Sequence, residues 1–387
     1  MTPRVTETPN ETDLDVVCLS HLRWNFVFQR PQHLLTRCAS RRRVFFVEEP
    51  IFEDGPTRLA VQSAQPGLWV AVPHMRHGLP EQERERIQHE LLNELFAEHG
   101  IEEYVLWYYT PMALAFTQHL TPAAVLYDCM DELSAFANAP PALRQREAEL
   151  LRRADVVLTG GHSLYEAKRD MHPNIHPLPS SVDTVHFARA RAAERIAEPV
   201  DQALIPHPRL GFFGVIDERM DIDLIAAIAE ARPDWQIVML GPVVKIDPAT
   251  LPRNTNIHWL GMKKYDELPA YLAGWDAALL PFARNASTRF ISPTKTPEYL
   301  AAGKPVVSTS IRDVVRPYGE LGLVHIADTP DDFVAAVEAC LGEAAEARAA
   351  RTARIDAFLA QMSWDHTYAR VEELLSACIV APRRIHV

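Results

Sequence analysis

The sequence predicts an α/β protein made of two Rossmann-like domains whose parallel sheets face a central cleft. The length of 387 residues exceeds one ordinary core and fits two domains of roughly 150–200 residues. Short apolar runs alternate with helical patterns in both halves, which is typical of parallel sheets with crossover helices. Residues 188–208 are rich in Ala, Arg, Glu and Pro and lack a strand pattern. The expected units are a loose tail (1–13), a first domain (14–190), a linker (191–208), a second domain (209–363) and a C-terminal helix (364–387).

The composition excludes several classes of protein. Hydrophobic residues make up 48% and charged residues 23%, as in globular proteins. The net charge of -12 argues against a nucleic-acid partner. Five cysteines without a CxxC pair favour reduced thiols over disulfides or zinc. The polar N-terminus does not resemble a signal peptide, and no apolar run reaches the ~20 residues of a membrane helix, so we expect a cytoplasmic protein.

Buried strands and amphipathic helices alternate through the first half. Residues 80–98 place Ile87, Leu91, Leu92 and Leu95 on one helical face, which predicts a surface helix. Ser163 and Glu166 have the spacing of a capping box. The expected strands are 14–20, 44–47, 68–73, 105–109, 124–128 and 154–161, and the other expected helices are 31–40 and 142–153.

Polar residues follow three of these strands, where open α/β sheets place their ligands. Arg23 and Arg30 lie in an aromatic-rich loop after the first strand, which is either part of the cleft or only a structural loop. Asp128 and Asp131 follow a later strand and either orient an acceptor hydroxyl or cap the next helix.

Gly161 and His162 lie at the end of the strand at 154–161. Gly161 allows a close approach of a ligand or a neighbouring strand. His162 is a candidate acid or base, although a single histidine is more often structural.

The second half repeats the pattern. Strands are expected at 210–216, 235–242, 256–262 and 277–282, with helices at 221–231, 265–273, 331–341 and 342–360. Gly214 lies near the end of the first of these strands and Arg219 follows just before a helix. A strand, a glycine turn and an arginine together predict an anion site. The alternative is that Arg219 pairs only with Asp217 or Asp221.

Residues 292–309 read as a loop, a short helix, a turn and a buried strand. Either Ser292 or Thr296 is suitable as the helix cap, and Gly303 is expected to end the helix. The helix start and Lys295 suit an anion such as a diphosphate, and Glu298 can accept hydrogen bonds from sugar hydroxyls. An ordinary capped helix is an equally good explanation of the spacing alone.

The run from Glu298 to Val307 resembles the donor-site segment of GT-B glycosyltransferases of the family-4 type. The resemblance implies a retaining transfer from a nucleotide sugar such as a UDP-sugar. It also implies that Glu298 binds the ribose and that Arg219 and Lys295 bind the diphosphate. The other donor-binding residues that it suggests are Gly214, Gly241, Met262, Lys264, Ser292 and Thr294. Asp131, His162, Arg219 and Lys295 are the catalytic candidates, and Arg23, Arg30, Asp128 and Gly161 face the acceptor.

The donor motif is a variant of the family pattern. Phe290 stands eight residues before Glu298, where the family usually has a glutamate that touches the transferred sugar. Met130 stands where many relatives have a histidine. The loop after the first strand lacks the usual glycine pair.

The resemblance predicts a metal-independent enzyme without a cofactor that glycosylates a glycan, lipid-linked or small-molecule acceptor in cell-surface polysaccharide or glycoconjugate synthesis. Two alternatives are a nucleotide-sugar epimerase of the same fold and a non-catalytic nucleotide-sugar-binding subunit. Arg37, Arg41, Arg42 and Arg43 form a cluster that either contacts an anionic membrane at its inner face or is a solvated helix end.

Overall fold

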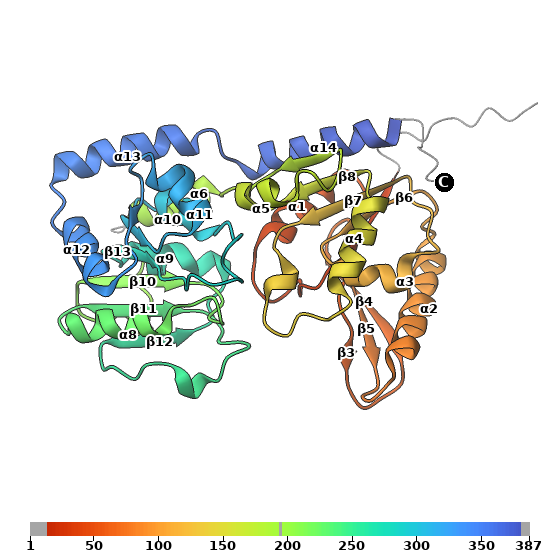
Figure 1. Ribbon diagram of the computed structural model, residues 1–387, viewed down its shortest axis with the longest axis horizontal. Coiled ribbons are helices and arrows are strands. Elements are labelled where there is room, and N and C mark those ends of the chain that lie inside the picture. Colours follow the sequence, from red (N-terminus) through yellow and green to blue (C-terminus); the bar gives the residue numbers. More distant parts are fainter. Residues whose placement is uncertain (1–13, 193–195, 381–387) are drawn as a thin grey trace, which may run out of the picture.

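The computed structural model describes residues 14–192 and 196–380. The predicted tail at 1–13, part of the predicted linker (193–195) and the end of the predicted C-terminal segment (381–387) lie outside the described residues. Figure 1 shows two lobes, each built around its own sheet, with α13 and α14 running along one side from the second lobe to the first. The two-domain α/β prediction is confirmed.

The first domain contains a nine-stranded sheet in the order β3-β5-β2-β1-β6-β7-β8-β9, with β4 paired to β5. All described pairings are parallel except that of β4, an edge strand that the sequence analysis missed. The strands are β1 (Asp15–Leu19), β2 (Val44–Val47), β3 (Ile51–Phe52), β4 (Arg58–Gln65), β5 (Leu68–Met75), β6 (Tyr104–Tyr108), β7 (Ala124–Cys129), β8 (Val156–Thr159) and β9 (Ile175–Pro177). The helices are α1 (Arg30–Cys38), α2 (Glu81–His99), α3 (Leu114–Thr117), α4 (Leu143–Arg153) and α5 (His162–Lys168).

The second domain contains a six-stranded parallel sheet in the order β12-β11-β10-β13-β14-β15. Its strands are β10 (Arg209–Phe213), β11 (Gln236–Leu240), β12 (Ile257–Gly261), β13 (Ala277–Leu280), β14 (Val306–Ser308) and β15 (His325–Ile326). The remaining helices are α6 (Thr184–Ala188), α7 (Val200–Ala203), α8 (Ile222–Ala231), α9 (Leu268–Ala273), α10 (Lys295–Ala301), α11 (Arg312–Val314), α12 (Pro330–Leu341), α13 (Ala345–Leu359) and α14 (Trp364–Val380).

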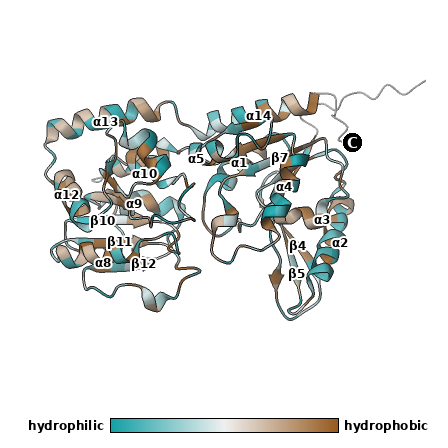
Figure 2. Cartoon of the chain, in the orientation of Figure 1, coloured by the Kyte–Doolittle hydropathy of each residue, from teal (hydrophilic) through white to brown (hydrophobic). Residues whose placement is uncertain are grey.

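Burial of apolar faces explains these elements. Every residue of β1, β2, β6 and β10 is buried, as expected for strands covered by helices on both faces. The face of α2 that was expected to pack is buried through Ile87, Leu91, Leu92 and Leu95. Figure 2 shows hydrophobic strands inside both lobes and hydrophilic stretches on α2 and α4.

The chain crosses between the domains twice. Val182, Phe187 and Ala190 lie in the core of the second domain, so the crossover comes earlier than the boundary expected at residue 190. Trp364 and Val371 of α14 lie in the core of the first domain, beside α1.

Candidate functional site

The strand order of the second sheet creates a crevice beside β10. The chain runs from β10 to β11 and β12 on one side and then returns to β13 on the other side. Loops after β10 and β13 therefore leave in opposite directions, and such a point is where open α/β sheets bind ligands.

Two glycines let the backbone and Lys295 come close together at this point. A Cβ on Gly241 would lie 1.8 Å from the carbonyl oxygen of Gly214. A Cβ on Gly214 would lie 2.0 Å from Cε of Lys295. Both glycines have positive φ values, 141° and 144°, which side-chain-bearing residues rarely adopt. The predicted donor residues Gly214 and Gly241 thus shape the crevice with their backbones.

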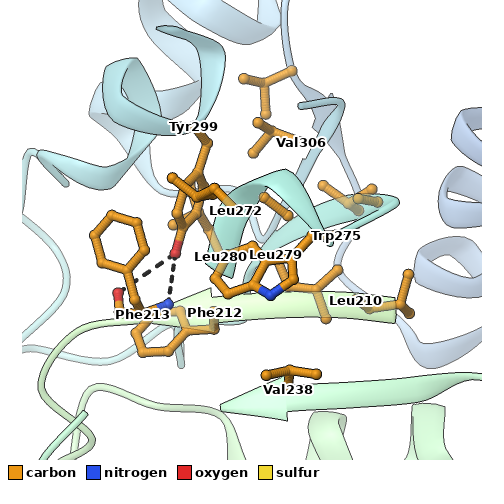
Figure 3. Packing of buried hydrophobic residues seen from close by; sticks show 14 of the residues in the cluster. Leu210, Phe212, Phe213, Val238, Leu272, Trp275, Leu279, Leu280, Tyr299 and Val306 are labelled. Atoms are coloured by element: carbon orange, nitrogen blue, oxygen red, sulfur yellow. Dashed lines mark hydrogen bonds between the residues drawn. The ribbon is translucent and has the colours of Figure 1, made fainter. Parts of the chain in front are cut away.

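Helix α10 is attached to β10 by a buried tyrosine (Figure 3). The hydroxyl of Tyr299 accepts a 2.9 Å hydrogen bond from the amide of Phe213 and donates to its carbonyl oxygen at 3.5 Å. This contact fixes Lys295 and Glu298, which lie on the first turn of the helix.

The expectation that Ser292 or Thr296 caps α10 is wrong. The residue before the helix is Thr294, which makes no side-chain cap, and the hydroxyl of Thr296 is buried without a hydrogen-bond partner. Because α10 has only seven residues, its dipole is small, and charged side chains dominate the electrostatics of the crevice.

Positive side chains gather at this crevice. Arg219 forms a forked ion pair with Asp217, with distances of 2.7 and 2.9 Å. Of the two alternative partners, Asp217 is therefore the one observed, whereas Asp221 caps α8 through the amide of Leu224. Lys295 lies close enough for Arg219 and Asp217 to act on its charge.

The first domain meets these cations through one aromatic ring. The guanidinium carbon of Arg219 lies 5.4 Å from the ring centroid of Phe136, and the ammonium of Lys245 lies 5.0 Å from it. The amide of Ala137 also donates to Glu218 at 3.4 Å. The loop that carries Phe136 thus covers two cations of the second domain.

Burial shifts the titration of the groups around Lys295. Loss of water lowers the pKa of the Lys295 ammonium, although the negative charge of Glu298 opposes the shift. Burial raises the pKa of Glu298 to about 8, and the positive charge of Lys295 opposes that rise. Burial also raises the pKa of Asp131 in the first domain, against the charge of Arg219. A bound diphosphate would restore the charged form of Lys295.

Two residues expected to face the acceptor lie elsewhere. Arg30 and Asp128 form an ion pair of 2.9 Å with no exposed side-chain surface, and Arg30 also donates to the carbonyl oxygen of Leu178. The pair is part of the interior of the first domain, so both expectations are corrected: neither side chain reaches solvent. Arg23 lies at the surface and pairs with Glu48 at 2.9 Å.

Gly161 and His162 lie at a contact between the domains. A Cβ on Gly161 would lie 2.2 Å from a carboxylate oxygen of Asp313 and 2.7 Å from Cβ of Ser292. His162 is exposed and lines a cavity of about 370 Å³ with Ser292 and Asp313. These residues are thus grouped with one another at the contact between the domains.

The capping box predicted for α5 is wrong. Asp313 of the second domain accepts the hydrogen bond from the amide of Ser163 at 2.9 Å, and the hydroxyl of Ser163 is buried without a partner. Glu166 pairs with Arg312. A carboxylate from the other domain therefore replaces the local cap.

Met262 and Lys264 follow β12 and are exposed. The amide of Lys264 donates to Glu267 at 2.8 Å, and no described contact joins either residue to Lys295. Their role in donor binding stays a prediction.

Sequence reasoning missed three residues of this region: Phe136, Lys245 and Tyr265. Tyr265 stacks on His186 at 4.2 Å and its buried hydroxyl has no partner. Burial and the charge of Glu298 raise the pKa of Tyr265, which places the phenol near Glu298. Lys245 has a positive φ of 62° and follows β11, and its position after a strand was the one available signal.

Among the described residues, no three or more His, Cys, Asp or Glu side chains are grouped so that they could hold a metal ion. The described helices also include none with the length and apolar character needed to span a bilayer.

Comparisons with known proteins agree with this geometry. Residues 207–343 match the family model of Glycosyl transferases group 1. The chain is 27% identical over 260 residues to a protein named as a teichuronic acid biosynthesis glycosyltransferase, TuaH of Bacillus subtilis; the match covers 62% of this chain and 64% of the relative, just under two thirds of its length.

Solved structures share the overall fold at low sequence identity. Sucrose-phosphate synthase from Thermosynechococcus elongatus has a TM-score of 0.72 at 14% identity, over 95% of this chain and 100% of that chain. HepE of Anabaena, in complex with UDP and glucose, has a TM-score of 0.67 at 13% identity, over 94% and 100% of the two chains. A trehalose-6-phosphate structure from E. coli bound with UDP-2-fluoro glucose has a TM-score of 0.70 at 11% identity, over 96% of this chain and 100% of that chain.

The chain thus shares the two-domain GT-B fold of these glycosyltransferase structures. Within this class, the second domain matches the glycosyl transferases group 1 family, and the resemblance seen in the donor segment is confirmed.

Proposed function

We propose that the chain is a retaining, metal-independent glycosyltransferase that moves a sugar from a nucleotide-sugar donor, such as a UDP-sugar, to an acceptor hydroxyl. The acceptor is a glycan, a lipid-linked saccharide or a small molecule used in cell-surface polysaccharide or glycoconjugate synthesis. The names of TuaH and of the UDP-bound structures support this proposal for substrates, and the family match supports it for the reaction class.

The observation that carries the proposal is that Lys295 and Glu298, on the first turn of α10, lie beside Arg219. Both cations lie at the switch point of the second sheet, and Gly214 leaves the space that Lys295 occupies. A carboxyl group one helical turn from a lysine can bind the ribose hydroxyls while the lysine contacts the diphosphate.

The mechanism follows from these charges. As the bond from the sugar to the diphosphate breaks, negative charge grows on the leaving oxygen. Arg219 and Lys295 are already positioned to stabilise that charge, so the reaction needs little rearrangement of the site. Asp131 faces them from the first domain and is available to orient the attacking hydroxyl. We infer attack from the same face of the sugar as the departing diphosphate, which gives retention.

A location in the cytoplasm, with peripheral contact to the membrane, is part of the proposal. The basic cluster contributes less to such contact than its sequence suggests. Arg37, Arg42 and Arg43 pair with Asp365, Glu372 and Asp15, which leaves Arg41 as the member without a described ion pair. We therefore expect this cluster to bind an anionic membrane only weakly and in a salt-sensitive way.

A thermal-shift panel tests the proposal. Purified protein is heated with UDP, ADP, GDP and their sugar conjugates, in the presence and absence of EDTA. A nucleotide at 100 times its Kd should stabilise the protein by about 2.7 kcal/mol, unchanged by EDTA. NMR of the product should then show the donor's anomeric configuration. The proposal fails if no nucleotide stabilises the protein, if EDTA abolishes transfer, or if the donor is isomerised without an acceptor.

A further inference from the structure

Residues 133–140 of the first domain form a loop that reaches the cations of the second domain, and we call this segment the lid loop. It follows β7, and its first three residues, Leu133–Ala135, form a 3-10 turn. None of its residues is buried, and none belongs to a hydrophobic cluster of the described chain. Opening the loop would therefore expose little apolar surface and require little free energy.

Both ends of the lid loop are anchored in the first domain. Before it, Glu132 pairs with Lys168, whose ammonium lies 2.8 Å from the Glu132 carboxylate. After it, α4 begins at Leu143, and Arg146 of this helix donates to the carbonyl oxygen of Met112 at 3.1 Å. The segment between these anchors can therefore move while the sheet and its helices stay in place.

Three weak interactions join the lid loop to the second domain. The guanidinium carbon of Arg219 and the ammonium of Lys245 lie 5.4 and 5.0 Å from the ring centroid of Phe136. The amide of Ala137 donates to Glu218 at 3.4 Å, which is long for a hydrogen bond, and the other carboxylate oxygen of Glu218 is buried without a partner. An exposed cation–π contact favours an equilibrium by only about two- to fivefold. The closed position of the loop is therefore only marginally stable.

The ring of Phe136 covers the side of Arg219 that faces the first domain. Asp217 accepts hydrogen bonds from Nε and Nη2 of Arg219, and no described hydrogen bond involves Nη1. A diphosphate that enters from the cleft and binds Arg219 and Lys295 would approach on the side where the ring lies. Its charged oxygens contact a guanidinium more strongly than the negative face of an aromatic ring does. The ring is thus a weak substitute for an anion, and a bound diphosphate would displace it.

We propose that the lid loop is autoinhibitory: in the ligand-free chain Phe136 closes the diphosphate site, and the nucleotide must displace this ring in order to bind. The inference rests on the proposed function for the position of the diphosphate. Because the nucleotide binds only the open form, its apparent affinity is reduced by the fraction of molecules that are open. After transfer, the returning ring competes with rebinding of the released nucleotide.

UDP binding to the full chain and to Phe136→Ala tests the direction of this effect. Removing the ring should lower the UDP Kd about five- to thirtyfold in calorimetric titration, because both cation–π contacts that favour the closed form are lost. Surface plasmon resonance should show a faster association and an unchanged dissociation rate. Phe26→Ala is the control. Phe26 is a 37% exposed ring of the same domain without a described ring or cation contact, and its variant should bind UDP like the wild type.

Hydrogen exchange follows the lid loop without a substitution in the binding site. UDP should speed the exchange of amides 133–139 in the wild-type chain, because displacement of the loop breaks the hydrogen bond from Ala137 to Glu218. In Phe136→Ala the same amides should exchange fast with and without UDP. The measurement without UDP reports the closed loop independently of any nucleotide.

The proposal is overturned if Phe136→Ala binds UDP no more tightly than the wild type, or if UDP slows exchange in the lid loop. Weaker binding with faster dissociation would show that Phe136 packs on the bound nucleotide. If neither chain binds UDP, while the lid amides are protected in the wild type and exposed in Phe136→Ala, the donor assignment fails although the closed loop exists. The two failures are therefore distinguishable.

Discussion

Replacing Glu298 with glutamine should make the ligand-free protein more stable at alkaline pH and yet weaken nucleotide binding. Glu298 is 8% exposed, and no described residue donates a hydrogen bond to its carboxylate. Its pKa is raised from 4.5 to about 8 because burial disfavours the charged form. Ionised Glu298 therefore destabilises the ligand-free protein, and a ligand that donates hydrogen bonds to its carboxylate would remove this destabilisation.

The size and sign of the effect follow from proton linkage. Since the folded pKa lies above the unfolded one, the folded state holds the proton more tightly, and stability is lost as pH rises from about 4.5 to about 8. At about 1.4 kcal/mol per pKa unit, the upper limit of this loss is about 5 kcal/mol. The opposing attraction of Lys295 is already contained in this pKa, so the figure is a net value for ionising Glu298. We expect Glu298→Gln to gain about 1–3 kcal/mol at pH 8 and almost nothing at pH 5.

Denaturant unfolding at pH 5 and pH 8, together with calorimetric titration of UDP, measures both sides of this prediction. The UDP Kd should rise about tenfold or more, since a hydrogen bond to a charged group contributes about 1.5–3 kcal/mol. Glu338→Gln, at an exposed ion pair with Arg232, is the control and should change neither quantity. A variant that is less stable at pH 8, or that binds UDP like the wild type, would refute the reasoning.

Three further changes probe other parts of the account. Lys295→Ala should lower kcat/KM for sugar transfer by 10²–10³, about 2.7–4 kcal/mol of lost stabilisation of the leaving diphosphate, measured by nucleotide release. Gly161→Ala should force the domains apart, because its new Cβ would lie 2.2 Å from a carboxylate oxygen of Asp313, and small-angle scattering should show a larger radius of gyration. Asp128→Asn should cost about 3–5 kcal/mol of unfolding free energy, because it leaves the charge of Arg30 buried and unpaired, with the UDP Kd unchanged.

Matched controls and contrary outcomes accompany these changes. Arg232→Ala removes an exposed cation of the same domain and should leave kcat/KM within twofold; an equal loss in both variants would point to a general charge effect. Gly342→Ala meets its nearest neighbour only at 3.3 Å, so its radius should match the wild type. If Gly161→Ala has the radius of gyration of the wild type, the side chain of Asp313 moves aside and the domains do not separate. If Asp128→Asn is as stable as the wild type but binds UDP less tightly, Asp128 acts in the cleft and its assignment to the interior is wrong.

The sequence was most informative where one local pattern decides the structure. Strands such as β1 and β10 are buried along their whole length, so a short apolar run was enough to predict them. The edge strand β4 was not predicted, because its residues are partly or fully exposed and its hydrophobic pattern is mixed. Its partner β5 begins after only Pro66 and Gly67, so the two strands form a hairpin whose turn signal was not used.

The site was predictable only in part, because several of its contacts join residues that are far apart in the sequence. Glu298 and Lys295 were found because they occupy one helical turn of a recognisable segment. The contact of Phe136 with Lys245 joins two domains, and the Arg30–Asp128 pair joins residues 98 positions apart. The expected cap of α5 was also wrong for this reason. Asp313, from the other domain, accepts the hydrogen bond of the Ser163 amide in place of the local hydroxyl.

A crystal structure of the protein with UDP tests the central claim most directly. The account predicts the diphosphate in contact with Arg219 and Lys295, and the ribose hydroxyls on the carboxyl group of Glu298, with Phe136 displaced from the two cations that it covers in the free protein. Density for the nucleotide at any other place, away from Lys295 and Glu298, would contradict it.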